Sequence, residues 1–274
     1  MPFFRRIAVI SCLVCATIAG KADAAAPAAK VTPEVVREMA PTGTLRAAIN
    51  LGNAVMAQKD ERSGKLGGVT VELANELGKR LGVPVSLVQF DAAGKVFEAM
   101  QQGQLDVAFI AVEPARAAEL DFTAPYVLIE ATYMVRNDSP LKSVADVDRP
   151  GVRIAVGRGS AYDLYLTRTI RNATIVRSAT GGCCSMIDLF VADKLEAVAG
   201  VRQQLVAHSG KDPSMRIMSD RFMDVPQAVA TRKGRTVTPA FLHAFVEEAK
   251  ASGFVAAALK RSGQVGAVVA PAAP

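Results

Sequence analysis

The sequence is poor in the residues that build metal centres and nucleophilic active sites. It has two histidines, His208 and His243, and four cysteines, of which Cys12 and Cys15 lie in an N-terminal apolar run. A metal site needs several such ligands close together, and neither a serine-nucleophile motif nor a cysteine–histidine pairing is present. We therefore expect no metal, no cofactor and no catalytic residue.

The other two cysteines, Cys183 and Cys184, are neighbours in the chain. Disulfide geometry does not allow adjacent cysteines an ordinary bridge. We interpret them as two thiols near the start of a helix, although an oxidising exterior would also permit a strained ring or a bridge to a partner.

Long apolar runs are absent after residue 20, so no membrane-spanning segment is predicted there. The run from Ile7 to Gly20 is too short to span a bilayer, follows two arginines and precedes the small-residue pattern Ala22-Asp23-Ala24. This arrangement is typical of a cleaved signal peptide. We predict a signal peptide over 1–24, in preference to a membrane anchor, and hence a periplasmic protein.

Neither sign of charge dominates the chain, whose formal net charge is +6 at pH 7. Removal of 1–24 takes away three basic residues and one acidic residue, which leaves +4. No basic stripe with interleaved aromatic residues is present, so nucleic acid is not an expected partner. The mild positive excess fits a small anionic ligand.

Short apolar strands alternate with segments of helical period, which indicates an α/β fold with mostly parallel sheets. This pattern lies between an Ala/Pro-rich leader, 25–43, and a flexible tail, 264–274. Pro84 places one strand near a sheet edge, and Gly253 divides the last helical segment into two helices. The predicted strands cover 45–49, 83–87, 105–112 and 152–156, and the predicted helices begin near 69, 96, 160, 187 and 238.

A helix followed by a strand occurs twice with the same spacing. Met100 and Asp106 in the first unit correspond to Phe190 and Glu196 in the second. This internal repeat supports an arrangement of two similar lobes.

Four stretches of the chain, taken in order, carry a resemblance to a known family. They resemble the bacterial extracellular solute-binding proteins of family 3, the polar amino-acid binders of ABC importers, over roughly 44–263. The stretches are Gly43-Thr44-Leu45-Arg46, Leu66-Gly67-Gly68-Val69 with Glu72-Leu73-Ala74, Gly103-Gln104-Leu105-Asp106-Val107-Ala108 with Pro114-Ala115-Arg116 and Asp121-Phe122-Thr123-Ala124-Pro125-Tyr126, and Ile154-Ala155-Val156-Gly157-Arg158-Gly159-Ser160.

The resemblance implies a two-lobed periplasmic binding protein type II fold. Each lobe would be a mostly parallel sheet flanked by helices, and two hinge strands would join the lobes around a ligand cleft. The implied boundaries are 34–130 plus 228–263 for lobe one and 136–222 for lobe two, with the hinge near 132–135 and 223–228.

The family's carboxylate-binding arginine falls on Arg116. A guanidinium is always charged and grips a carboxylate with two parallel hydrogen bonds. Arg116 also follows the end of a buried strand, where α/β sheets place their ligands. We predict that it binds the ligand, in preference to a surface ion pair with Glu119.

The loop Gly157-Arg158-Gly159-Ser160 precedes a helix, with Ser160 as N-cap and Asp163 completing a capping box. A helix N-terminus attracts anions. We predict that the amides of Gly159, Ser160 and Ala161 meet the ligand carboxylate from lobe two, although a purely structural cap is the alternative.

The sequence departs from the family at several positions that the resemblance places beside the ligand. Asn53 and Ala93 replace aromatic walls, Ala111 replaces a hydroxyl beside Ile110, and Val201 replaces the acid that pairs an α-amino group. Asn50 and Asn53 are ligand hydrogen-bonders or turn formers. A buried ammonium needs a counter-charge, so either Glu196, Asp91 or Glu113 supplies it, or the ligand is not a standard α-amino acid.

The resemblance predicts a monomeric binding protein that delivers an amino acid or related small carboxylate to an inner-membrane ABC permease. Two alternatives remain open at this point. One is a dehydratase-type enzyme on the same fold, with Glu113 or Glu196 as general acid or base. The other is a binding protein that feeds a membrane sensor.

Overall fold

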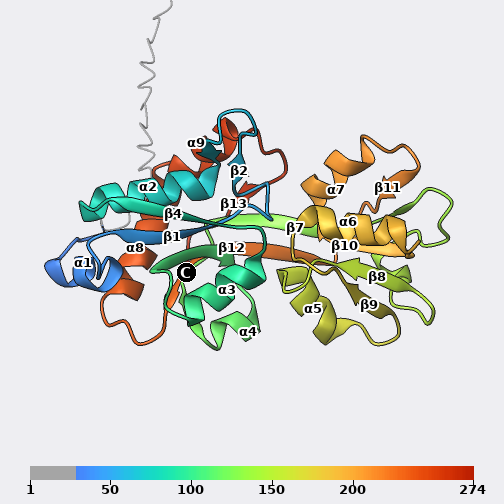
Figure 1. Cartoon of the computed structure of the whole chain (residues 1–274), viewed down its shortest axis with the longest axis horizontal. Coiled ribbons are helices and arrows are strands. Elements are labelled where there is room, and N and C mark those ends of the chain that lie inside the picture. Colours follow the sequence, from blue (N-terminus) through green and yellow to red (C-terminus); the bar gives the residue numbers. More distant parts are fainter. Residues whose placement is uncertain (1–28) are drawn as a thin grey trace, which may run out of the picture.

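The computed structural model describes residues 29–274. The predicted signal peptide, with Cys12 and Cys15, lies outside these residues. The described chain forms two α/β lobes, and two long strands run from one lobe into the other (Figure 1). These strands are β7 (Val127–Arg136) and β12 (Met223–Arg232).

Lobe one is built on three parallel strands, β4, β1 and β5, with β4 at the edge that Pro84 predicts. Central strand β5 is buried along its whole length, as its apolar sequence predicts. The elements of lobe one are α1 (Pro33–Met39), β1 (Leu45–Asn50), β2 (Gln58–Lys59), β3 (Leu66–Gly67), α2 (Val69–Leu81), β4 (Val85–Phe90), α3 (Ala93–Gln101), β5 (Val107–Ala111), α4 (Pro114–Ala117), β6 (Leu120–Phe122), α8 (Thr238–Ala251), α9 (Phe254–Arg261) and β13 (Val268–Val269).

Lobe two repeats this plan with parallel strands β10, β8 and β9. The second helix–strand unit of the sequence repeat is α6 followed by β10. Helix α6 begins at Cys183, four residues before the predicted start near 187, and the two adjacent cysteines lie at its start as predicted. The elements of this lobe are the 3-10 helix η1 (Val144–Asp146), β8 (Arg153–Val156), α5 (Ala161–Thr169), β9 (Thr174–Arg177), α6 (Cys183–Ala192), β10 (Ala197–Val201), α7 (Arg202–Ser209) and β11 (Met215–Ile217).

The two long strands make one curled sheet continuous through both lobes. Within it, β12 pairs with β5 of lobe one and with the first half of β7, over 223–227. The second half of β7 turns to β10 and β11 of lobe two. All these pairings are antiparallel, so the parallel part of each lobe ends at a hinge strand. The predicted lobe and hinge boundaries stay predictions.

Helix α2 follows directly from its sequence pattern. Its apolar residues recur every four positions, and Leu73 and Leu77 are fully buried. Gly82 ends the helix in the left-handed conformation, with φ of 70°. The predicted helix over 69–81 is confirmed, and so is the division of the C-terminal segment at Gly253.

The predicted leader is wrong over part of its length. Residues 33–39 form α1, in which Thr32 is the N-cap and Pro33 takes the first turn. Val35 and Met39 are buried against lobe one. Alanine and proline suggested a loose segment, but two apolar residues four positions apart are enough to dock a short helix.

The predicted flexible tail is also wrong in part. Strand β13 pairs with the first residues of β7, and Ala270 is buried and donates its amide to the Tyr126 carbonyl at 3.1 Å. The tail therefore adds a short strand beside the start of β7, because the main-chain N–H and C=O groups of β7 need hydrogen-bond partners.

Candidate ligand-binding site

A cavity of about 40 Å³ lies between the lobes, where the carboxyl ends of their parallel strands meet. Each lobe contributes its strand ends and the first turn of a helix, and β12 forms the floor. Open α/β sheets place ligands at such ends. The lining residues are Asn50, Gly52, Asn53, Ala93, Ala111, Arg116, Ser160, Ala161, Tyr162, Gly181, Val201, Gln204, Val225 and Gln227.

Arg116 is the only cation that lines this cavity within residues 29–274, and 1% of it is exposed. Its Nη1 donates to the Ala111 carbonyl at 2.9 Å, and its Nη2 donates to the Gly159 carbonyl at 2.8 Å. Burial lowers the pKa of Arg116 to about 10, which still leaves it protonated at neutral pH.

No carboxylate of the described residues forms an ion pair with Arg116. Glu119, the alternative partner considered from the sequence, is exposed, and only its main-chain amide bonds to Arg116. The nearest acid that acts on Arg116 is Glu113, yet its two oxygens bind Arg168 at 2.6 and 2.7 Å. A buried cation without a counter-ion is costly, so this guanidinium is prepared for an anion that arrives from outside.

The lobe-two loop 157–160 differs from the prediction that three successive amides, those of Gly159, Ser160 and Ala161, bind the ligand carboxylate. Ser160 caps α5 by accepting the Asp163 amide at 3.0 Å, as expected. However, the Gly159 amide donates to Asp163 Oδ2, and the Ser160 amide donates to the Gly157 carbonyl. Two of the three predicted amides are therefore occupied, and the Ala161 amide is left at the helix N-terminus facing the cavity.

Asparagine side chains occupy the other side of the cavity. The Asn50 Oδ1 accepts the Gly52 amide at 3.1 Å, and the Asn53 Oδ1 accepts the Val55 amide at 3.3 Å. Because main-chain amides bind the oxygens, the orientation of both side-chain amides is determined. Each therefore forms a turn, as one sequence interpretation has it, and the two residues also line the cavity. Their hydrogen bonding to a ligand stays a prediction.

Three contacts close the lobes around the cavity. Gly159 accepts from Arg116 across the cleft, Gln204 Nε2 donates to the Gly52 carbonyl at 3.1 Å, and Arg168 binds Glu113. The loops also meet at glycines, because a Cβ added to Gly159 would lie 3.2 Å from the Gly94 Cα. The described conformation is thus a closed one.

Most of the residues expected beside a ligand do line this cavity. They are Arg116, Ser160, Ala161, Ala111, Asn50, Asn53, Ala93 and Val201. Gly159 does not line the cavity, and its carbonyl accepts from the Arg116 guanidinium. Their role in ligand binding stays a proposal.

Two of the expected residues lie elsewhere. Ile110 points into the apolar cluster beneath α3, because alternate residues of a strand face opposite sides. Glu196 stands at the amino end of β10, opposite to the cavity, and binds Arg153 through both oxygens.

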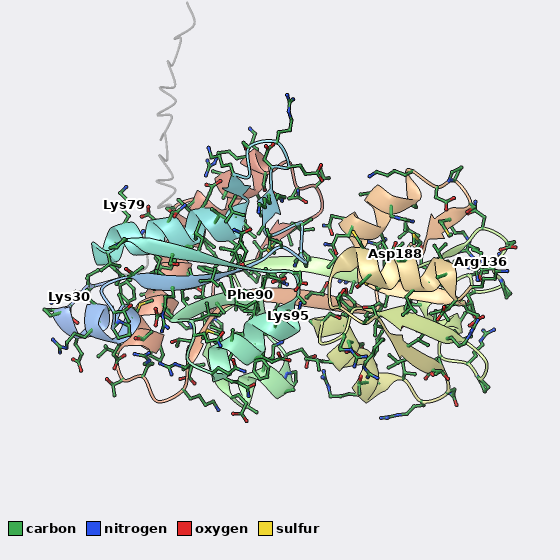
Figure 2. The ribbon with its side chains drawn as sticks, viewed as in Figure 1. Lys30, Lys79, Phe90, Lys95, Arg136 and Asp188 are labelled. Carbon is green, nitrogen blue, oxygen red and sulfur yellow. The ribbon has the colours of Figure 1, made fainter. Side chains whose placement is uncertain are left out.

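The three acids proposed as counter-charges are all engaged outside the cavity. Glu113 and Glu196 bind arginines, and Asp91 Oδ2 binds Lys95 Nζ at 2.8 Å. Lys95 lies on the side of lobe one that faces lobe two (Figure 2). None of these acids lines the cavity, and the two sequence alternatives, a counter-charge from one of them or a ligand that is not a standard α-amino acid, stay predictions.

Sequence reasoning missed several lining residues, chiefly Gln204 and Gln227. Gln227 is 3% exposed and interrupts the apolar run of β12, and an isolated amide in a buried strand is a usable signal. Gln204 lies in the first turn of α7, just past β10, and the end of a buried strand is where α/β sheets place their ligands.

Two further findings on the described chain concern metal ligands and membrane spans. No group of three or more His, Cys, Asp or Glu residues within 29–274 is placed to hold a metal ion. None of the helices in this part of the chain combines the length and apolar character that a bilayer span requires.

Comparison with curated proteins identifies distant relatives. The L-cystine-binding protein TcyJ of Escherichia coli (strain K12) is 25% identical over 181 residues, which covers 62% of this chain and 64% of that protein. The ABC transporter glutamine-binding protein GlnH of Bacillus subtilis (strain 168) is 21% identical over 202 residues, or 71% and 72% of the two chains. The chain thus spans less than two thirds of the cystine-binding protein.

Solved structures show the same fold. A mutant of the arginine-binding protein ArgBP from T. maritima superposes with a TM-score of 0.71 at 22% identity, covering 84% of this chain and 99% of that one. The ancestral amino acid-binding protein AncCDT-1, a precursor of cyclohexadienyl dehydratase, gives 0.69 at 23% identity over 84% and 99%.

One family model matches residues 45–264, which is most of the chain and includes every residue that lines the cavity. The protein belongs to the bacterial extracellular solute-binding proteins, family 3.

Proposed function

We propose that this protein captures a small carboxylate-bearing solute between its lobes and presents it to an ABC importer. The observation that carries the proposal is Arg116, a fully buried cation that lines the interlobe cavity with no carboxylate partner among residues 29–274. A ligand carboxylate would accept its remaining N–H groups and replace the hydration lost on closure. A ligand that touches both lobes stabilises the closed form by its differential affinity.

The importer setting rests on the relatives. One is described as an ABC transporter glutamine-binding protein, and another as an L-cystine-binding protein. We also propose a periplasmic location and a permease partner, which the family and the signal peptide predicted over 1–24 support. One chain supplies the whole cavity lining, so a monomer suffices for this role.

The dehydratase-type alternative needs a carboxylate that reaches the bound substrate. Glu113 and Glu196, the two candidates from the sequence, are held by Arg168 and Arg153 outside the cavity. Binding without turnover is therefore the better proposal, and incubation with prephenate should leave that compound unchanged. A role in feeding a membrane sensor uses the same clamp, and a permease or a kinase gene beside this one would distinguish transport from sensing.

A thermal-shift screen tests the binding proposal. The purified protein would be melted with amino acids, hydroxy acids, keto acids and dicarboxylates. A ligand at one hundred times its dissociation constant should add about 2.7 kcal/mol of stability.

The decisive variant is Arg116→Ala, and Arg62→Ala in an exposed turn is its matched control. We expect the Arg116 variant to lose the shift and bind roughly a hundredfold more weakly. Its unliganded melt should fall little, because an unpaired buried charge is removed. The assignment of Arg116 is refuted if this variant responds to the ligand as fully as the control does.

A further inference from the structure

The interlobe cavity has an unbalanced charge. Arg116 contributes one positive charge, and no aspartate or glutamate of the described residues lines the cavity. The buried acid near it, Asp163, is fully engaged, because Oδ1 binds Arg177 at 2.9 Å and Oδ2 binds the Gly159 amide at 2.8 Å. The closed site therefore needs a ligand whose own charge is negative.

The hydrogen-bonding groups that face this cavity are mainly donors. Asn50 and Asn53 have their oxygens occupied by main-chain amides, which leaves both NH2 groups available. The Ala161 amide stands at the N-terminus of α5, with no partner in the described hydrogen bonds. Together with the Arg116 guanidinium, these groups can donate hydrogen bonds to a carboxylate and to one further oxygen atom of the same ligand.

An ammonium group would find poor partners here. The Ala111 and Gly159 carbonyls already accept from Arg116, and the Gly52 carbonyl accepts from Gln204. The side-chain oxygens of Gln204 and Gln227 are neutral. An ammonium buried against neutral oxygens, beside a guanidinium, loses its hydration without gaining an opposite charge.

The net charge of the occupied cavity separates the ligand classes. A zwitterionic α-amino acid is neutral overall and leaves the closed cavity with the full charge of Arg116. A monoanion brings the sum to zero, and a dianion inverts it. Uncompensated charge in a water-poor site is disfavoured, so the monoanion is the best match.

We infer that the ligand is a small monocarboxylate that carries a neutral hydroxyl or keto oxygen and no ammonium group. This inference rests on the proposed binding function and makes its ligand class specific. Arg116 and the Ala161 amide hold the carboxylate, and the asparagine NH2 groups donate to the second oxygen. The amino-acid-binding relatives named above are 21 to 25% identical, so their ligands do not determine the chemistry of this cavity.

The test compares acids that share a carbon skeleton and differ at the second carbon. Titration calorimetry would use lactate, pyruvate and alanine as one set, and 2-hydroxyisovalerate, 2-oxoisovalerate and valine as another. We expect the hydroxy or keto acid of at least one set to bind ten times more tightly than its amino counterpart. Equal or tighter binding of the amino acid in both sets would contradict the inferred ligand class, while the proposed binding of a carboxylate between the lobes would still hold.

A charge-adding variant provides the second measurement. Gln227→Glu places a carboxylate at the cavity with little change of volume, and Gln101→Glu makes the same change on an exposed helix position. We expect the Gln227 variant alone to shift the affinity ratio at least tenfold toward the amino acid. An unchanged ratio in a variant that melts normally would contradict the charge argument.

One further outcome tests the proposed binding function itself, separately from the ligand class. If no amino, hydroxy, keto or dicarboxylic acid changes the melting temperature or releases heat, the proposed function fails together with this inference. A response confined to amino acids contradicts the inference alone.

Discussion

The two lobes carry the same contact at the amino ends of their central strands. In lobe one, the amide and the guanidinium of Arg46 bind the Asp106 carboxylate at 2.7 to 2.9 Å. In lobe two, Arg153 binds Glu196 in the same way at 2.8 to 2.9 Å. The Asp106 side chain is completely buried, whereas 34% of the Glu196 side chain is exposed.

The arginines at the two ends of the parallel strands have different roles. At the amino ends, an arginine and a carboxylate come from neighbouring strands, and their contact ties the two strands of each lobe together. At the carboxyl ends, Arg116 has no such partner among the described residues, and it faces the cavity instead. Arg46 and Arg153 therefore stabilise their lobes, and Arg116 is available to a ligand.

The largest expected effect on stability comes from the lobe-one contact. Asp106→Ala would leave the Arg46 guanidinium without its partner in a partly buried place. Removing one member of a buried pair is strongly destabilising, so we expect a loss of about 2–3 kcal/mol in the free energy of unfolding. Urea denaturation measures it, and a loss no larger than that of the matching lobe-two variant would break the comparison.

The contact between the lobes should affect binding more than folding. Glu113 of lobe one is 2% exposed and binds Arg168 of lobe two in the closed form described here. Glu113→Gln would weaken closure, and we expect ligand affinity to fall roughly tenfold, about 1.4 kcal/mol. Calorimetry would compare it with Glu119→Gln, an exposed change on the same lobe. Equal affinities in the two variants would show that this contact plays no part in closure.

Acid should reduce the stability that a hydrogen-bonded carboxylate, Glu38, gives to lobe one. Burial acts to raise the pKa of Glu38, yet hydrogen bonds from Thr236 and Thr238 outweigh it and lower the pKa to about 2, from an ordinary 4.5. Because the folded pKa is the lower one, the carboxylate stabilises lobe one above pH 4.5 and loses that effect as the pH falls toward 2. Glu38→Gln should melt earlier than the parent protein at pH 6, and the gap should narrow on acidification. A gap that is constant with pH would disprove this linkage.

The smallest effect is expected at the exposed lobe-two contact. Glu196→Ala removes a carboxylate that water already screens, so the free energy of unfolding should change several-fold less than in Asp106→Ala. Parallel urea titrations of both variants would measure the ratio. The variant should also bind ligand normally, since Glu196 lies at the opposite end of β10 from the cavity.

Sequence patterns predicted the elements that have strong local signals. The four-residue apolar step and Gly82 defined α2, and Pro84 identified the edge strand. The short helix α1 and strand β13 were missed, because only contacts with distant segments make those short stretches stable.

The site was predictable at strand ends and unpredictable in its details. The position of Arg116 after β5 and of Ser160 before α5 could be inferred from chain order alone. That Asp163 occupies the Gly159 amide could not, because the capping residue reached one position further back than the motif implies. The roles of Gln204 and Gln227 also emerged only when the lobes were brought together.

The amino-acid order by itself determined the α/β alternation, since periodicity and turn residues are local properties, and its resemblance to a known family implied the two-lobed fold and the arginine of the cleft. Tertiary structure alone decided which charges cancel. Glu113, Glu196 and Asp91 each had a plausible claim on the ligand, and each is held instead by a basic side chain. Charge pairing depends on distances across the folded chain, and for that reason the cavity of this protein is left with one cation and no anion among the described residues.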